Sequence, residues 1–220
     1  MEAMRRMIIA VALMLGAYGI GHAQAVDVGL VQQVSGDVTY VSSTGSGKVQ
    51  AFMKMRQGDK FTLPAAAQVQ VVYFQNGRKE TWRGAAVFNV GAERSDAVRG
   101  TVQQVATLPV GVSQKIQKIP DMIQMARLGG IQVRSAPQKP RVDAQEKAEL
   151  AAARATYTQL RQQLPPDDIT PELYLFAVLQ DSLLYDEMKT VVDEMMRKQP
   201  ASGEARQLAE WLRVRLQPVK

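Results

Sequence analysis

The chain has 220 residues, a formal net charge of +6 and 46% hydrophobic residues, so it can bury a core in one or two domains. It has no cysteine, and its only histidine, His22, lies in a segment that we expect to be removed. A mature chain without these residues excludes Ser-His-Asp triads, Cys-His dyads and most zinc sites. We therefore predict a protein that is not an enzyme and that holds no metal or cofactor. Its positive charge is dispersed, so we predict no nucleic-acid partner.

Residues 1–25 have the three parts of a secretory signal peptide. Arg5 and Arg6 precede an apolar run over 7–20, and small residues follow at Ala23 and Ala25. The alternative, an uncleaved anchor, is disfavoured because the run falls short of about 20 apolar residues. No cysteine follows it, so a bacterial lipoprotein is excluded. We expect export to the periplasm, cleavage after Ala25 or after Ala23, and no membrane span in the mature chain.

The part of the chain that follows has the pattern of short, half-buried β-strands. Apolar and polar residues alternate, and small turn residues interrupt them. We predict a turn over 42–48 and strands over residues 30–40, 49–53, 60–63, 69–74, 78–82 and 86–90. Asn76-Gly77 predicts a hairpin with a type I′ turn, since both residues tolerate a positive φ. So many short strands with frequent glycines indicate a small antiparallel sandwich or roll.

This order of strands and turns resembles the FecR-like domain of bacterial envelope proteins. The matching positions are Val34, Gly36, Val38, Gly58, Asp59, Val69, Val71, Tyr73, Asn76, Gly77 and Trp82. The regulator that names the family has a cytoplasmic segment and a membrane helix ahead of this domain, whereas this chain has only the expected signal peptide. The resemblance therefore implies a non-catalytic β module in the cell envelope, without direct transmembrane control of a sigma factor. We assign this FecR-like domain to residues 26–100.

Residues 101–142 are expected to connect the β domain to a helical region. Helical spacing over 113–119 and again over 121–128, interrupted by Pro120, predicts one kinked helix or two short helices. Residues 131–134 are expected to form a strand that returns to the β domain, and 135–141 a linker with two prolines. An apolar cluster is predicted to be core rather than a ligand site; its members are Ile116, Ile119, Met122, Ile123 and Met125.

The remaining residues, 143–220, predict four helices with apolar stripes. The first covers 143–164 and is stopped by two prolines, and its stripe is Leu150, Ala153, Tyr157, Leu160 and Leu164. In the second, Thr170 is expected to cap the helix start before Pro171, and the inner face is Leu173, Phe176, Leu179 and Leu183. The third begins at Tyr185, ends before Pro200, and carries Met188, Val191, Val192, Met195 and Met196. Ser202 is expected to cap the fourth, with Leu208, Trp211, Leu212 and Leu216 inside.

The two middle helices resemble one tetratricopeptide repeat. Tyr185-Asp186-Glu187 stands where that repeat has Tyr-Asp-Glu, Pro200 stands at its closing proline, and Leu175 also fits. Phe176 and Met188 replace the small residues that the repeat prefers where its helices touch. The resemblance implies a short array of α-hairpins that docks a protein or peptide. The predicted fold class is thus α+β, a small antiparallel β-sandwich or roll followed by an all-α hairpin array.

These features support three hypotheses about function. The first is a non-enzymatic envelope scaffold or adaptor that holds another protein, with Met188, Met195 and Met196 as an adaptable surface. The nearest alternative is a module that binds peptidoglycan or another surface glycan, with exposed rings at Tyr40, Tyr73 and Trp82, the last two as neighbours across the hairpin. An enzyme that acts through paired carboxylates, such as Asp167-Asp168 or Asp193-Glu194, is disfavoured because adjacent residues on a helix point to different faces.

Overall fold

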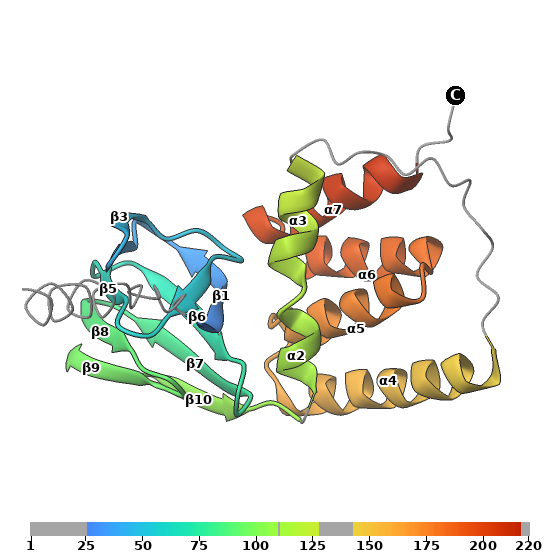
Figure 1. Cartoon of the computed structure of the whole chain (residues 1–220), viewed down its shortest axis with the longest axis horizontal. Helices are drawn as coiled ribbons and strands as arrows, with labels where there is room; N and C mark the ends of the chain where they lie inside the picture. Colours follow the sequence, from blue (N-terminus) through green and yellow to red (C-terminus); the bar gives the residue numbers. More distant parts are fainter. Residues whose placement is uncertain (1–25, 110, 128–142, 217–220) are drawn as a thin grey trace, which may run out of the picture.

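The computed structural model describes residues 26–109, 111–127 and 143–216. Within them the chain forms two antiparallel sheets of five strands each, followed by a helical C-terminal region, which confirms an α+β fold (Figure 1). The expected signal peptide over 1–25, the expected strand over 131–134 and the expected linker lie outside the described residues.

The two sheets form a sandwich around an apolar core. Sheet A contains, in spatial order, β10 (Gln104–Thr107), β7 (Arg78–Arg83), β6 (Gln68–Tyr73), β1 (Asp27–Ser35) and β4 (Lys54–Arg56). Sheet B contains β3 (Gly45–Lys48), β2 (Thr39–Ser42), β5 (Lys60–Leu63), β8 (Ala86–Val90) and β9 (Ser95–Arg99). Alternate residues of both sheets point inward, and the Phe88 ring stacks on Phe61 and Trp82 at centroid distances of 5.1 and 4.6 Å.

Three predictions about the strands were wrong in detail. The single strand expected over 30–40 is two strands in different sheets, because Gly36 adopts a φ of 81° and turns the chain between β1 and β2. The stretch expected to be a turn contributes β3, which pairs with β2. Residues 49–53 form no strand, since Phe52 has a φ of 60° there, and β4 begins only at Lys54.

The hairpin between β6 and β7 is confirmed, but its turn type is not. Only Gly77 has a positive φ, 65°, whereas a type I′ turn requires one at Asn76 too. Val72 pairs with Lys79, which leaves a longer loop between the strands. Asn76 instead stabilises this loop through its side chain, which accepts a hydrogen bond from the Arg78 amide at 3.0 Å.

The helices follow the predicted boundaries closely. Two short helices, α2 (Val112–Ile116) and α3 (Ile119–Arg127), precede α4 (Ala144–Gln163), α5 (Thr170–Asp181), α6 (Tyr185–Lys198) and α7 (Gly203–Leu216). Asp143 and Glu146 form a capping box at the start of α4, and the Ser202 hydroxyl accepts from the Ala205 amide at 3.1 Å, as expected of a cap. Thr170 does not cap α5, because it is the first residue inside the helix and its hydroxyl accepts a hydrogen bond from Lys79.

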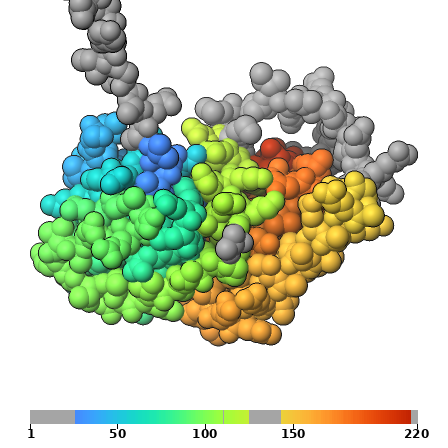
Figure 2. Space-filling model, turned by 60° about the horizontal axis from the view of Figure 1, so that its bottom comes forward, coloured from blue at the N-terminus to red at the C-terminus, as the bar shows by residue number. Residues whose placement is uncertain are grey.

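The face of sheet A that points away from sheet B is covered by the helices. Leu30, Val72, Phe74 and Leu108 join one apolar cluster with residues from α2 to α7. Figure 1 shows α2 and α3 end to end between the sandwich and the ends of α5, α6 and α7, and Figure 2 shows their atoms filling the space between the two parts. Along this line α2 packs on α5 and α3 on α7. The outer face of sheet A and the helices therefore share one apolar core, which is separate from the core between the two sheets.

Most apolar residues predicted to be core are indeed buried. In the connection these are Ile116, Ile119, Met122 and Ile123, at 0 to 8% exposure, while the side chain of Met125 lies outside the description. Two predictions were wrong: Leu183 and Leu216 are 46% and 39% exposed. Leu183 has a φ of 56° in the turn between α5 and α6, which directs it away from the inner face of α5.

Candidate functional site

The aromatic residues predicted as a sugar-binding surface are for the most part buried in the sandwich. Tyr73 and Trp82 are 0 and 1% exposed, because both lie on the faces of β6 and β7 that point toward sheet B. Trp82 pairs with Val69 across the hairpin, so the two rings are not cross-strand neighbours. Their polar atoms are also used internally, by hydrogen bonds to Ser95 and Glu80. Burial accordingly raises the pKa of Tyr73. Neither ring can stack on a sugar.

The methionines of α6 are core residues and not an adaptable surface. Met188 and Met195 are fully buried, and Met196 is partly buried against the same cluster. The reason is the position of α6, which packs between α5 and α7. Of the six predicted surface residues, Tyr40 retains an accessible ring: it is half-buried and lines a hollow described below.

A buried polar cluster joins sheet A to the start of α5. The Lys79 ammonium on β7 forms an ion pair with Asp168 and donates to the Thr170 hydroxyl at 2.7 Å. The same hydroxyl lies 2.9 Å from Oε1 of Gln32 on β1, and the Thr170 amide donates to Asp168 at 2.9 Å. Lys79 and Asp168 are 4% and 6% exposed, and the other two residues are fully buried. We call these four residues the junction cluster.

Burial and pairing oppose each other in the junction cluster. Loss of water lowers the pKa of Lys79, and the nearby Asp168 charge offsets only part of this effect. Burial raises the pKa of Asp168, but the charge of Lys79 and the hydrogen bonds from Lys79 and Thr170 outweigh it, so the pKa falls below its ordinary value of 3.8. The carboxylate is thus ionised in the folded protein at neutral pH.

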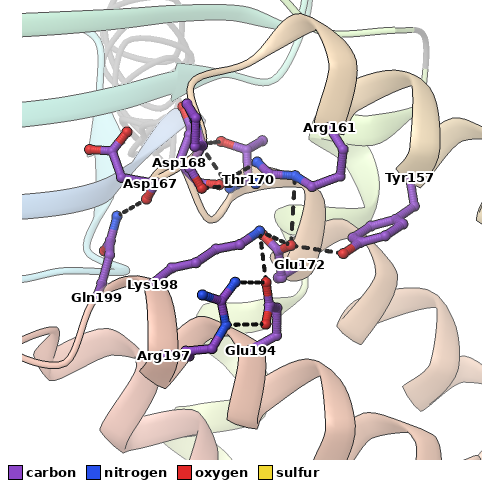
Figure 3. A network of polar contacts seen from close by, with 11 residues as sticks. Tyr157, Arg161, Asp167, Asp168, Thr170, Glu172, Glu194, Arg197, Lys198 and Gln199 are labelled. Carbon is purple, nitrogen blue, oxygen red and sulfur yellow. Dashed lines mark hydrogen bonds and ion pairs between the residues drawn. The ribbon is translucent and has the colours of Figure 1, made fainter.

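A second polar group continues from this cluster into the helices (Figure 3). The fully buried Glu172 of α5 accepts from the Tyr157 hydroxyl at 2.9 Å and from Lys198 at 2.7 Å. Burial together with the charge of Glu172 raises the pKa of Tyr157 to about 12. Hydrogen bonds from Arg197, joined by the charge of Lys198, lower the pKa of Glu194 to about 2. These contacts tie α4, α5 and α6 together.

Neither group is arranged for catalysis. The carboxylates that were considered and disfavoured as an enzyme site are engaged in ion pairs, Asp168 with Lys79, Asp193 with Lys189, and Glu194 with Arg197. Asp167 is exposed, and its carbonyl accepts a hydrogen bond from Gln199 (Figure 3). A substrate would reach the junction cluster only if the sheet and the helices separated. We therefore interpret both groups as structural.

The junction cluster was missed in the sequence. Its one available signal is the alternation along β7, where Lys79 and Thr81 face away from the inward-pointing Trp82. A lysine at such a position is usually exposed to water. Lys79 becomes a buried partner of Asp168 only because the helices cover this face. No local sequence pattern predicts that contact.

The loss of folding stability at acid pH tests whether Asp168 is ionised and paired in the folded chain. Since its folded pKa lies below 3.8, the pair contributes its full stability above that pH and loses it as the pH falls through the folded value. We expect the urea midpoint of the wild-type chain to drop more steeply below about pH 4 than that of the Lys79→Met/Asp168→Leu variant. Circular dichroism at a series of pH values measures this, and parallel profiles would contradict it.

Two adjoining hollows lie along α3 at the protein surface. The larger, about 510 Å³, lies toward the sandwich and includes Tyr40, Lys48, Lys54 and Asp121 in its lining. The smaller, about 430 Å³, lies against α7 and is lined by Ile123, Gly203, Arg206, Gln207, Glu210, Trp211 and Val214. Ile123 and Gln207 line both, so the hollows adjoin. Together we call them the α3 groove.

Two negative findings concern the described residues alone. Among them no three or more His, Cys, Asp or Glu side chains gather in a way that could hold a metal ion. None of the helices in 26–109, 111–127 and 143–216 is both long and apolar enough to cross a membrane.

Comparisons with known proteins identify no relative. The chain matches no protein-family model, no curated protein and no solved structure.

Proposed function

We propose that this protein is a non-enzymatic adaptor of the bacterial cell envelope that binds another protein along the α3 groove. Under this proposal the leader exports the chain to the periplasm, the sandwich is a FecR-like module and the C-terminal helices are TPR-like hairpins. The observation that carries the proposal is the groove itself. Its two hollows, of about 510 and 430 Å³, share Ile123 and Gln207, so they form one concave surface larger than either hollow alone.

The other surfaces of the helical region support this assignment by contrast. Nine of the twelve residues of α5 are buried, because sheet A, α2 and the neighbouring helices cover it. The methionines of α6 face the core. The groove instead combines apolar residues, such as Ile123 and Val214, with polar side chains at its rim, which is the composition of a non-obligate protein interface.

Site-specific photo-crosslinking in cells of the source organism tests this proposal. A photoreactive phenylalanine analogue at Gln124, an exposed residue of the groove, should give a discrete adduct with a protein. The matched control places the analogue at Thr62, an exposed residue of sheet B, where no such adduct is expected. Identical adducts at both positions, or none at either, would count against an adaptor that uses the groove.

A glycan-binding module is the second candidate, and Tyr40 is the observation in its favour. The ring is half-buried in the larger hollow beside Lys48 and Gln50, where it is available to stack on a sugar. Sedimentation of the purified mature protein with peptidoglycan tests it. Cosedimentation that is lost in Tyr40→Ala would favour this candidate, and release of soluble glycan would overturn the proposal of a protein without catalytic activity.

A further inference from the structure

We infer that the smaller hollow of the α3 groove binds an acidic peptide segment that carries a large apolar side chain. This inference rests on the proposed adaptor function and names the chemistry of the partner. It follows from the floor of the hollow, from the charges at its rim and from the contrast with the larger hollow.

The floor of the smaller hollow is apolar. Ile123 of α3 and Trp211 of α7 are 6% and 2% exposed, and they form its base. Val214, one turn beyond Trp211, is 41% exposed and extends the apolar surface toward solvent. A Leu, Ile or Phe side chain of a partner that covered this area would leave water, which favours binding.

The rim carries an excess of positive charge. Arg206 belongs to the lining, and Arg215 lies beside it against the ring of Trp211; within the described residues neither arginine has a carboxylate partner. Arg206 donates to the carbonyls of Pro200 and Ala201, and the Arg215 guanidinium lies 4.0 Å from the centre of a Trp211 ring. The acidic residue in the lining, Glu210, is paired with Arg213 at 2.6 Å. A visiting carboxylate therefore meets arginines whose charge is not neutralised by the protein.

The larger hollow does not share this excess. Its Lys48 is paired with Asp37 and its Lys54 with Asp121, each at 2.7 Å. The preference for negative charge is thus confined to the α7 end of the groove. Guanidinium groups beside an apolar floor suit a carboxylate next to a Leu or Phe, because each arginine can form charge-assisted hydrogen bonds while the side chain fills the hollow.

Fluorescence anisotropy with a defined probe tests the inference. The probe is a labelled synthetic peptide with Leu-Phe at its centre and Asp and Glu on both sides, added to the mature wild-type chain. In one control peptide Lys replaces the acidic residues, and in another Ser-Gly replaces Leu-Phe. We expect the acidic apolar peptide to bind more tightly than both controls, and added salt to weaken its binding.

Charge reversal on α7 supplies the matched variants. Arg206→Glu/Arg215→Glu should weaken binding of the acidic peptide about tenfold or more. Lys60→Glu, which reverses an exposed charge on sheet B, should leave it unchanged. Because Arg206 and Arg215 are exposed, the double variant should keep the circular dichroism spectrum of the wild type.

Several outcomes would overturn the inference. These are equal binding of the acidic and basic peptides, an unchanged Kd in the α7 double variant, or a self-association of the chain that the same double variant abolishes. Binding of phosphatidylglycerol vesicles without binding of the peptide would assign the arginines to a membrane surface. A discrete adduct at Gln124 with no peptide binding would reject the acidic partner and keep the adaptor, whereas loss of both results would reject the adaptor as well.

Discussion

Replacing Lys79 by methionine is expected to lower the free energy of unfolding by about 3 to 5 kcal/mol. The variant keeps most of the side-chain volume but leaves the Asp168 carboxylate buried without its cation, at 6% exposure. Thr170 and Gln32 cannot replace it, because neither carries a positive charge. Urea denaturation followed by far-ultraviolet circular dichroism measures the change.

A double variant distinguishes the cost of leaving one charge without its partner from the net contribution of the ion pair to stability. Lys79→Met/Asp168→Leu removes both charges, and we expect it to recover most of the lost stability, since an apolar pair can replace a buried ion pair at little cost. Lys48→Met removes an exposed ammonium that is paired with Asp37, and it should leave the midpoint unchanged. If Lys79→Met were as stable as the wild type, Asp168 would not be held as an ion pair.

Removal of α4 to α7 is expected to abolish the fold of the sandwich. A chain that ends before Asp143 exposes the outer face of sheet A, where Leu30, Val72 and Phe74 contact the helices. Each of these side chains loses roughly 1.5 to 3 kcal/mol of burial energy, and their sum approaches the whole stability of a typical domain. We expect this fragment to aggregate or to lack a near-ultraviolet signal from Trp82.

Size-exclusion chromatography and near-ultraviolet circular dichroism distinguish these outcomes, with residues 26–220 as the control. The full chain should unfold in one transition, because one apolar cluster runs from sheet A through α2 and α3 to α7. A monomeric fragment with the native signal of Trp82 would show that the sandwich is independent. This result matters for binding studies, since a loss of binding on truncation reports unfolding as readily as a lost docking surface.

Local signals in the sequence were sufficient for the helices and for the central strands. The cap at Ser202, the acidic start at Asp143 and the prolines between helices are short-range features, and they act in the folded chain as they do in isolated helices. The alternation over β5, β6 and β8 likewise follows from one buried face per strand. These elements were predicted nearly residue by residue.

The edge strands and the split at Gly36 could not be predicted in this way. β9 and β10 consist mostly of exposed residues, so they have no buried face to produce an alternation. Across Gly36 the apolar alternation continues without a break, and only the change of sheet between β1 and β2 shows that the chain turns there. β9 pairs with the preceding strand β8, β10 pairs with β7, and β1 and β2 pair with strands of different sheets. Pairing between strands, and not a local pattern of burial, therefore determines the structure in both cases.

The candidate site was the least predictable part. A sequence shows that Tyr73, Trp82 and Met188 are large and apolar, but large apolar side chains serve cores more often than surfaces, and here all three are buried. The α3 groove depends on the meeting of α3 with α7 and with the loop before β4, segments far apart in the chain. Such a surface has no local sequence signature.

Sheet A is covered by sheet B on one face and by the helices on the other, and this arrangement restricts how the protein can evolve. A β module whose outer face is exposed to solvent can be recombined with many different C-terminal regions, because its stability does not depend on them. Here a new neighbour would have to supply both a carboxylate opposite Lys79 and an apolar surface opposite Leu30 and Val72. We therefore expect homologues to inherit the sandwich and the helices together, with paired changes at Lys79 and Asp168, and to be rare as shuffled parts of larger proteins.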